Sequence, residues 1–404
     1  MSSVPNYFTT SLKTGLENTS GPVLSQEQTI HSHCWIELSH ANFNQNICSI
    51  KKLIGPKISI NAVLKSNAYG HGLIPVATLC QENKLVNYLA IFLASDALIL
   101  RQEKITKPIL VLGGYDTSLD KLILENITLV IYDWPTAQEF AAKAQELKHI
   151  TQVHLKIDSG LMRLGFMPTE ILEVTQFLIK NPFIKITGIY SHFAESDSSD
   201  LTFTNKQINN FNYALKILAD HGITIPYIHL ANTAATLRLT QAHGTMIRCG
   251  GLLYGTYKNE LFYQQTREQV PDFKLNSFLS LKARVIAIKT VPAHTPVGYA
   301  CSFVTTRPTT IAIVSLGYFD GYDRRLSNNS VALIHDKLVP LLGRTGMNMI
   351  TIDITDAPQT KLNDTVTLIG DYPGIRVQEI AKRIGAIDYE IFARLNQSLT
   401  RIII

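Results

Sequence analysis

Eight strand-like runs alternate with helix-like segments between residues 35 and 272, and this alternation most restricts the folds open to the chain. The runs, rich in Val, Ile, Leu and Tyr, occupy residues 58–64, 88–93, 108–112, 128–132, 152–157, 185–190, 227–230 and 246–253. Intervening segments such as 169–180 and 205–221 repeat apolar residues at spacings of three and four. Eight strands alternating with helices over roughly 240 residues are typical of a (β/α)8 barrel. A doubly wound open sheet competes with it, but no GxGxxG sequence follows the first strand.

The pattern changes after about residue 276. Short strand-like runs at 279–288, 310–316, 330–334, 337–341, 349–354 and 365–369 are separated by turn sequences, and only 376–384 is clearly helical. We therefore predict three parts: a polar and flexible N-terminal extension over 1–32, a barrel over 33–274, and a C-terminal, mostly β domain over 275–404.

Composition excludes several classes of function. The net charge is +5 over 404 residues, and the basic residues are scattered, so no nucleic-acid surface is expected. The five cysteines form no CxxC pair and no metal-like cluster with histidine, which predicts no metal site and suits the reducing cytoplasm. The longest apolar runs have the length of a strand, so we expect no membrane span.

The first strand of the predicted barrel ends on a lysine, in Asn61-Ala-Val-Leu-Lys65-Ser-Asn-Ala-Tyr69-Gly-His71-Gly72. A buried ammonium is unfavourable unless it is paired or neutralised. A lysine held in partly apolar surroundings has a lowered pKa and becomes a nucleophilic amine suited to Schiff-base chemistry. A lysine that merely reaches solvent from a strand end is the competing interpretation, and these residues alone leave both open.

Segment 61–72 resembles the cofactor-lysine motif of the alanine racemases, which bind pyridoxal 5′-phosphate on a (β/α)8 barrel. The resemblance extends in order over about residues 33–404. It includes Lys156-Ile-Asp158-Ser-Gly160-Leu-Met-Arg163, Ile189-Tyr190-Ser191-His192, His229-Leu-Ala-Asn232-Thr233, Met246-Ile-Arg248-Cys-Gly250-Gly251 and Pro296-Val-Gly-Tyr299.

The resemblance implies a set of residues that hold the cofactor. Lys65 would bind it covalently, Arg163 would bond its phenolic oxygen, and Lys156, often carbamylated in the family, would hold Arg163. In the competing interpretation, Lys156 and Arg163 have only a structural role and form a local ion pair with Asp158. Arg248 would face the pyridine nitrogen and His192 would lie beneath the ring. The phosphate would be bound by Tyr69, Thr233 and Gly251, and Asn232 and Gly250 would also belong to the cofactor-binding residues.

Racemisation needs a base on each face of the α-carbon. Lys65 supplies one, and the resemblance assigns the other to Tyr299, which in the family comes from the partner subunit. An ordinary strand tyrosine is the competing interpretation of Tyr299. Because the two bases lie in different domains, we expect an obligate homodimer with composite sites.

The β domain carries further implied site residues. Tyr318 would gate the substrate entrance, Arg324 would line the corridor with Asp197 as a partner, and Met347 would bind the substrate carboxylate together with Arg163. The chain departs from the family pattern at several positions, including Gly346, where cysteine is common, and two that concern the expected site. Asn348 replaces the usual aspartate, and Gln397 stands where a tyrosine near the phosphate is expected; both bear on substrate range.

The function expected is a pyridoxal-phosphate-dependent isomerase, an alanine racemase that supplies D-alanine for peptidoglycan. Alternatives within the same chemistry are a serine or broad-spectrum amino-acid racemase and, less favoured, a decarboxylase. From another class, a non-catalytic pyridoxal-phosphate-binding protein of cofactor homeostasis or regulation competes. The complete β domain argues against it, since such proteins can consist of the barrel alone.

Overall fold

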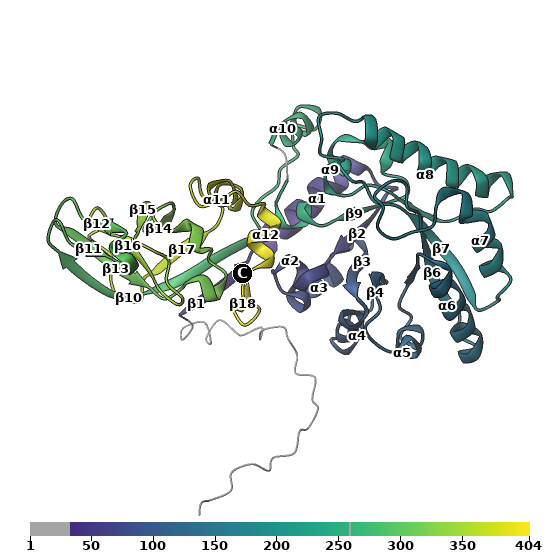
Figure 1. Ribbon diagram of the computed structural model, residues 1–404, viewed down its shortest axis with the longest axis horizontal. Helices are drawn as coiled ribbons and strands as arrows, with labels where there is room; N and C mark the ends of the chain where they lie inside the picture. The colour runs from purple at the N-terminus through teal and green to yellow at the C-terminus, as the bar shows by residue number, and fades with distance from the viewer. Residues whose placement is uncertain (1–32, 258–259) are drawn as a thin grey trace, which may run out of the picture.

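A computed structural model describes residues 33–257 and 260–404, so the predicted extension over 1–32 lies outside the described residues. The chain forms two bodies side by side along the longest axis, a barrel of parallel strands and a smaller body of mostly antiparallel strands (Figure 1). The long strand β10, Leu279–Val291, runs from one body into the other.

All eight predicted barrel strands are present. They are β2 (Ser59–Val63), β3 (Val86–Leu93), β4 (Ile109–Gly114), β5 (Leu129–Ile131), β6 (Thr151–Lys156), β7 (Ile184–Tyr190), β8 (Tyr227–His229) and β9 (Met246–Cys249). Parallel ladders join β9-β2-β3-β4 and β5-β6-β7-β8. Backbone hydrogen bonds close the ring, from Val111 N to Thr128 O (3.0 Å) and from Arg248 N to Ala231 O (3.1 Å). The (β/α)8 prediction is confirmed.

Helices surround this ring because their apolar faces pack on the strands. They are α1 (His40–Ile54), α3 (Leu73–Glu82), α4 (Ala94–Gln102), α5 (Leu119–Leu124), α6 (Trp134–Leu147), α7 (Ile171–Ile179), α8 (Thr202–Asp220), α9 (Thr233–Arg238) and α10 (Glu260–Gln269). The predicted strand over 246–253 is wrong beyond Cys249, since the chain turns at Gly250 and forms a 3-10 turn over Gly251–Tyr254.

The second body is a closed, mostly antiparallel sheet. Because β10 pairs with both β13 and β17, the strands β13 (Thr309–Val314), β16 (Ile350–Asp353), β15 (Lys337–Leu342), β14 (Val331–Ile334), β17 (Thr365–Ile369) and β10 form a ring. Two very short strands, β11 (Pro296–Val297) and β12 (Phe303–Val304), form a separate hairpin. The predicted mostly β domain is confirmed.

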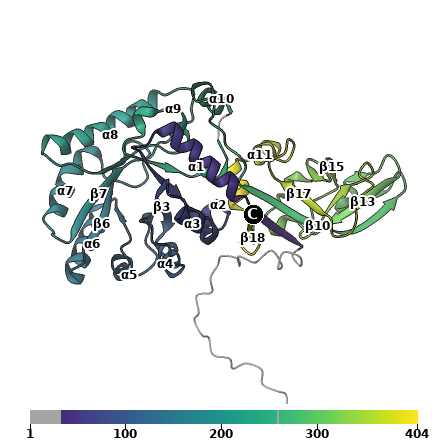
Figure 2. The same ribbon diagram turned by 180° about the vertical axis from the view of Figure 1, so that it is seen from behind.

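The two ends of the described chain meet in this sheet. β1 (Cys34–Leu38) pairs antiparallel with β10 and parallel with β18 (Thr400–Ile403). Figure 2 shows β1 running beside β10 into the second body. Helices α11 (Val377–Ile384) and α12 (Asp388–Ala393) follow the sheet, and α12 lies at the junction of the two bodies (Figure 1). The β domain therefore places α12 against the barrel.

Candidate active site

A cavity of about 820 Å³ opens at the carboxyl ends of the barrel strands, where enzymes of this fold carry their sites. Ten of the predicted site residues line it. They are Lys65, Tyr69, Lys156, Arg163, His192, Asp197, Asn232, Thr233, Arg248 and Gly250. The lining also includes Tyr389 and Ala393, two residues of α12 that were not predicted. Segments far apart in the sequence thus meet in one space.

Lys65 lies at the start of α2 (Lys65–Tyr69), which is a single left-handed turn. Ser66, Asn67, Ala68 and Tyr69 have φ between 51° and 55°. This conformation is unfavourable by roughly 1–2 kcal/mol per non-glycine residue, so surrounding contacts must hold it. The strained turn sends both Lys65 and Tyr69 toward the cavity.

Three groups hold that turn. The Asn67 side chain accepts a hydrogen bond from Leu73 N (2.7 Å), and the His71 ring donates to Ala68 O (2.9 Å). Arg401, fully buried in β18, donates to Gly70 O (2.8 Å). A Cβ at Gly70 would overlap the Phe392 carbonyl oxygen, so the turn also packs directly on α12. His71, for which no site role was predicted, supports the backbone.

Four cationic side chains line one cavity: Lys65, Lys156, Arg163 and Arg248. Removal of water by the surrounding protein lowers the pKa of Lys65, and the charges of Arg163 and Arg248 lower it further. Burial, and then Arg163, lower the pKa of Lys156 to about 8. A cavity with this excess of positive charge is suited to an anionic ligand, and it favours a neutral, nucleophilic Lys65.

Asp158 does not serve as the local ion-pair partner that the sequence left open. Its carboxylate accepts hydrogen bonds from the backbone N–H groups of Gly160 (2.9 Å), Met162 (3.1 Å) and Arg163 (2.7 Å). Burial alone would raise the pKa of Asp158, but these bonds from the backbone of its own loop lower it below its ordinary value. Asp158 therefore shapes the loop that presents Arg163 to the cavity.

Arg248 is buried on β9, and its guanidinium makes several hydrogen bonds. Its guanidinium donates to the carbonyl oxygens of His229 (2.6 Å) and Ser191 (2.7 Å). It also contacts ring nitrogens, Nδ1 of His229 at 3.0 Å and Nδ1 of His192 at 3.2 Å. Because arginine only donates, both Nδ1 atoms are acceptors and each neutral ring carries its proton on Nε2. Burial and then the Arg248 charge lower the pKa of His192, and burial, His154 and Arg248 lower the pKa of His229. Both rings are therefore kept neutral.

Two hydroxyl groups of the cavity lie against adjacent glycines. A Cβ at Gly250 would lie 2.6 Å from the Tyr69 hydroxyl, and one at Gly251 would overlap the Tyr389 hydroxyl. Tyr389 also hydrogen-bonds Thr233 and Thr256 through their side chains. Asn232 caps α9, accepting from Ala235 N at 3.0 Å, and this places Thr233 at the rim. These groups are suited to a phosphate.

Two predicted cofactor residues do not line the cavity: Gly251 lies directly behind the cavity-lining Tyr389, whereas Gln397 is not brought to the site. Its side chain is exposed and does not line the cavity, and its carbonyl oxygen accepts from Arg401. Tyr389 and Ala393 are the residues near the C-terminus that line the cavity. No sequence signal marked Tyr389, because only the packing of α12 on the Lys65 turn brings it to the cavity.

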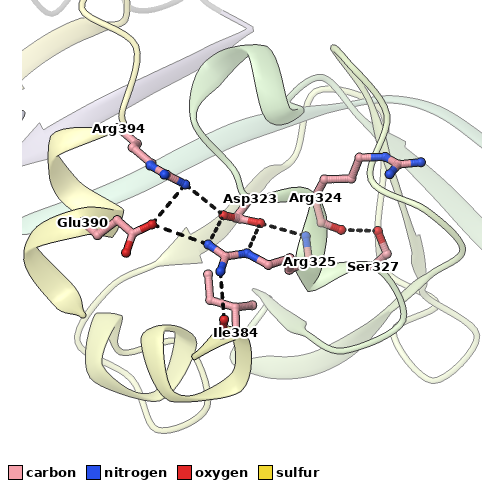
Figure 3. Close-up of polar contacts among 7 residues, drawn as sticks. All are labelled: Asp323, Arg324, Arg325, Ser327, Ile384, Glu390 and Arg394. Carbon is pink, nitrogen blue, oxygen red and sulfur yellow. Dashed lines mark hydrogen bonds and ion pairs between the residues drawn. The ribbon is translucent and has the colours of Figure 1, made fainter. Parts of the chain in front are cut away.

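Helix α12 is fixed to the β domain by an ionic network. Arg325 contacts Asp323 (2.7 Å) and Glu390 of α12 (3.6 Å), and Arg394 contacts the same two acids (Figure 3). Arg325 also donates to the Ile384 carbonyl oxygen (3.0 Å). The Arg324 side chain points away from this network (Figure 3). Together with Arg325, Ser327 and Arg344 it lines a second cavity, of about 340 Å³.

The remaining predicted residues lie on the β domain and do not line the barrel cavity of the same chain. Tyr299, Tyr318 and Met347 are exposed by 73%, 41% and 54%, and Asn348 is exposed beside them. Backbone bonds from Tyr318 N to Gly346 O and from Phe319 N to Met347 O join their segments. We call Tyr299, Tyr318, Phe319 and Met347 the β-domain face. The second predicted base is therefore displayed outward.

Pyridoxal phosphate fits the chemistry of this cavity. A lysine of lowered pKa can bind its aldehyde, hydroxyl groups and glycine N–H groups can bind its phosphate, and the cations offset its negative charge. Among the described residues, no group of His, Cys, Asp and Glu side chains is arranged to hold a metal ion. Over residues 33–257 and 260–404, no helix has the length and apolarity to cross a membrane.

Comparison with known proteins agrees with this geometry. Residues 38–258 match the family described as alanine racemase, N-terminal domain, and residues 278–403 match alanine racemase, C-terminal domain. An alanine racemase of Methanococcus maripaludis is 36% identical over 372 residues, covering 91% of this chain and 98% of its own. Alanine racemase 2 of Bacillus subtilis is 35% identical over 375 residues, covering 91% and 93%. The structure of the alanine racemase of Clostridium difficile superposes with a TM-score of 0.86 at 32% identity, covering 93% and 96%.

Proposed function

The chain belongs to the alanine racemase family, and from that premise we propose which of its residues interconvert L- and D-alanine. Lys65 acts on one face of the α-carbon, and Tyr299 of the partner subunit acts on the other. One observation carries the proposal: the cavity that holds Lys65 lacks Tyr299, which its own chain displays on an exposed face. A two-fold dimer would bring each β-domain face to the mouth of the other cavity.

Pyridoxal phosphate, when bound, supplies the electron sink that makes the α-proton of an amino acid removable. We assign its covalent attachment to Lys65. Tyr69, Tyr389, Thr233, Gly250 and Gly251 would hold its phosphate. Arg163 would bond its phenolic oxygen and Arg248 would face its ring nitrogen. The support is that these groups meet in one cavity.

Lys65 is the base that the barrel supplies. Its lowered pKa keeps a larger share of the amine neutral at physiological pH, which a proton acceptor requires. The Arg163 and Arg248 charges that lower this pKa also oppose protonation, so the proton that Nζ accepts is readily returned.

To act as a base, Tyr299 of the partner subunit requires surroundings that stabilise its phenolate form, since a free tyrosine has a pKa near 10. The Nδ1 atom of His192 accepts from Arg248, which leaves Nε2–H as the donor of that ring. A donor that bonds the phenolate form favours it, and the cations of the cavity act in the same direction. We propose that His192 Nε2 meets the hydroxyl of Tyr299 of the partner subunit.

Arg248 would influence the reaction because it is a poor proton donor. A guanidinium has no readily released proton, so it cannot readily protonate a ring nitrogen that it faces. By leaving that nitrogen unprotonated, Arg248 would favour prompt return of the proton over side reactions. Five contacts at 3.3 Å or less hold the guanidinium in that orientation.

Lys156 would complete the site as a carbamate. Carbon dioxide reacts with a neutral amine, and the pKa of Lys156 at about 8 makes the neutral form accessible. The resulting anion would pair with Arg163 in a cavity that is otherwise rich in cations.

Substrate would be held by Met347 N–H and Arg163 and would pass Tyr318, Arg324 and Asp197. We further propose that the enzyme works in the cytoplasm, where its five free cysteines stay reduced, and supplies D-alanine for peptidoglycan. The test is the conversion of L-alanine to D-alanine by the purified holoenzyme, with kcat/KM compared across alanine, serine, lysine and arginine. A preference for another amino acid would replace alanine as the substrate.

A further inference from the structure

His154 on β6 extends the Arg248 network away from the cavity. Its Nδ1 lies 2.9 Å from Nε2 of His229, whose Nδ1 in turn lies 3.0 Å from the Arg248 guanidinium. Both imidazoles are fully buried, and His154 does not line the cavity. It therefore touches neither substrate nor cofactor and reaches the site only through His229.

The hydrogen bonds fix where each proton lies. Arg248 can only donate, so Nδ1 of His229 is an acceptor and the proton of this neutral ring is on Nε2. That proton points to Nδ1 of His154, which must accept it. The His154 proton is then on its own Nε2. One direction of donation therefore runs from Arg248 through His229 to His154, and His154 supplies the acceptor that the Nε2–H of this His229 tautomer requires.

The barrel is built to accommodate this ring. Gly188 on β7 pairs with His154, and the strand register shifts between Val153 and His154. A Cβ at Gly188 would overlap Nδ1 of His154, so only glycine leaves room for the imidazole. Nε2 of His154 is buried without a hydrogen-bond partner among the described residues. An aliphatic side chain would fill the space without burying that polar atom, so packing alone does not account for a histidine here.

We propose that His154 is a positioning residue of the racemase, which holds His229 in the tautomer that accepts from Arg248 and so orients the guanidinium that faces the cofactor. The proposal rests on the proposed function for its effect on rate. The hydrogen bond between His154 and His229 itself does not require the cofactor. Without the Nδ1 acceptor, His229 can place its proton on Nδ1, where it opposes an Arg248 N–H.

Two variants with the same number and branching of side-chain heavy atoms separate hydrogen bonding from packing. In His154→Asn the amide oxygen can replace Nδ1 as the acceptor, whereas His154→Leu offers none. Because Arg248 keeps its carbonyl partners, we expect His154→Leu to lower kcat about tenfold, the effect of one hydrogen bond to a charged group. KM for alanine should change little, since Arg248 faces the cofactor, and His154→Asn should retain most of kcat.

The second readout is nitrogen NMR of cofactor-free protein labelled with 15N-histidine, with His229 assigned by the signals lost in His229→Gln. The wild type should show an unprotonated Nδ1 and a protonated Nε2 on His229, and His154→Leu should lose this pattern. A protonated Nδ1 on His229 in the wild type would overturn the proposal. Equal kcat in His154→Leu and His154→Asn would overturn it as well. The NMR result does not depend on racemase activity, so it distinguishes this failure from a failure of the proposed function.

Discussion

The Tyr389 ring meets the Tyr69 ring edge to face, with centroids 5.5 Å apart and planes inclined by 71°. Tyr69 belongs to the lysine-bearing turn of the barrel, and Tyr389 belongs to α12 after the β sheet. Their hydroxyl groups lie against the adjacent glycines Gly250 and Gly251. The proposed phosphate end of the cavity therefore depends on both domains of one chain.

Replacing Tyr389 with Phe should weaken cofactor binding about tenfold, because it removes one hydrogen bond to a charged phosphate while the ring contact stays. Titration of the cofactor-free protein with pyridoxal phosphate, followed by absorbance, measures this. Gln397→Ala is the matched control and should bind as the wild type does, since Gln397 is exposed outside the cavity. The reverse ranking would restore the role that the sequence suggested for Gln397.

Most of the fold could be predicted from the sequence because parallel barrel strands are buried on both faces and read as continuous apolar runs. Ile60–Val63, for example, is buried at every position. β1 and β18 escaped prediction because their partners are far away in sequence: β1 pairs with β10 and β18. Short strands at opposite ends of a chain carry no local signal of their pairing.

The site was predictable where a residue directly follows a barrel strand, as Lys65 and His192 do. It was not predictable where tertiary packing places the residue. Tyr389 reaches the cavity because α12 packs on the Lys65 turn, and Asp158 bonds backbone N–H groups of its loop rather than a lysine. The left-handed turn at Ser66–Tyr69 also has no sequence signature, since none of its four residues is glycine.

Lys65→Ala should abolish racemisation, lowering kcat/KM by at least about 1,000-fold, because it removes both the covalent attachment and one base. The visible absorption of the bound cofactor should change at the same time. Lys57→Ala, at an exposed lysine close in sequence, is the control and should leave both unchanged. Racemisation by Lys65→Ala at the wild-type rate would exclude the mechanism.

Lys156 should make the stability of the cofactor-free protein depend on pH. Its pKa falls from 10.5 in the unfolded chain to about 8 in the fold, so the unfolded state binds more protons between these values. The free energy of unfolding should therefore rise with pH across this window, by up to about 3 kcal/mol. Lys156→Met should be more stable than the wild type below pH 8, with a gain that shrinks toward pH 10.5. Urea unfolding in carbon-dioxide-free buffer at pH 7 and pH 10 measures it; an equal difference at both pH values would contradict the burial of a titrating lysine.

Carbamylation of Lys156 should appear as a carbonyl signal when the protein is incubated with 13C-bicarbonate. The signal should grow as the pH rises through about 8, since the neutral amine reacts, and it should be absent in Lys156→Met. Its persistence in Lys156→Met would assign the carbamate to another lysine.

In the proposed dimer, each site takes Lys65 from one chain and Tyr299 from its partner. Lys65→Ala and Tyr299→Phe homodimers should both be inactive. In a mixed dimer, one of the two sites combines the intact Lys65 of one chain with the intact Tyr299 of the other.

Refolding the two variants together, or co-expressing them, therefore tests directly whether each site is built from residues of both chains. Random association makes half of the dimers mixed, each with one intact site of two, so the mixture should recover about a quarter of wild-type kcat per chain. Recovery near that fraction is the result we predict. Inactivity of a mixture that demonstrably contains mixed dimers would show that both bases come from the same chain and would contradict the account.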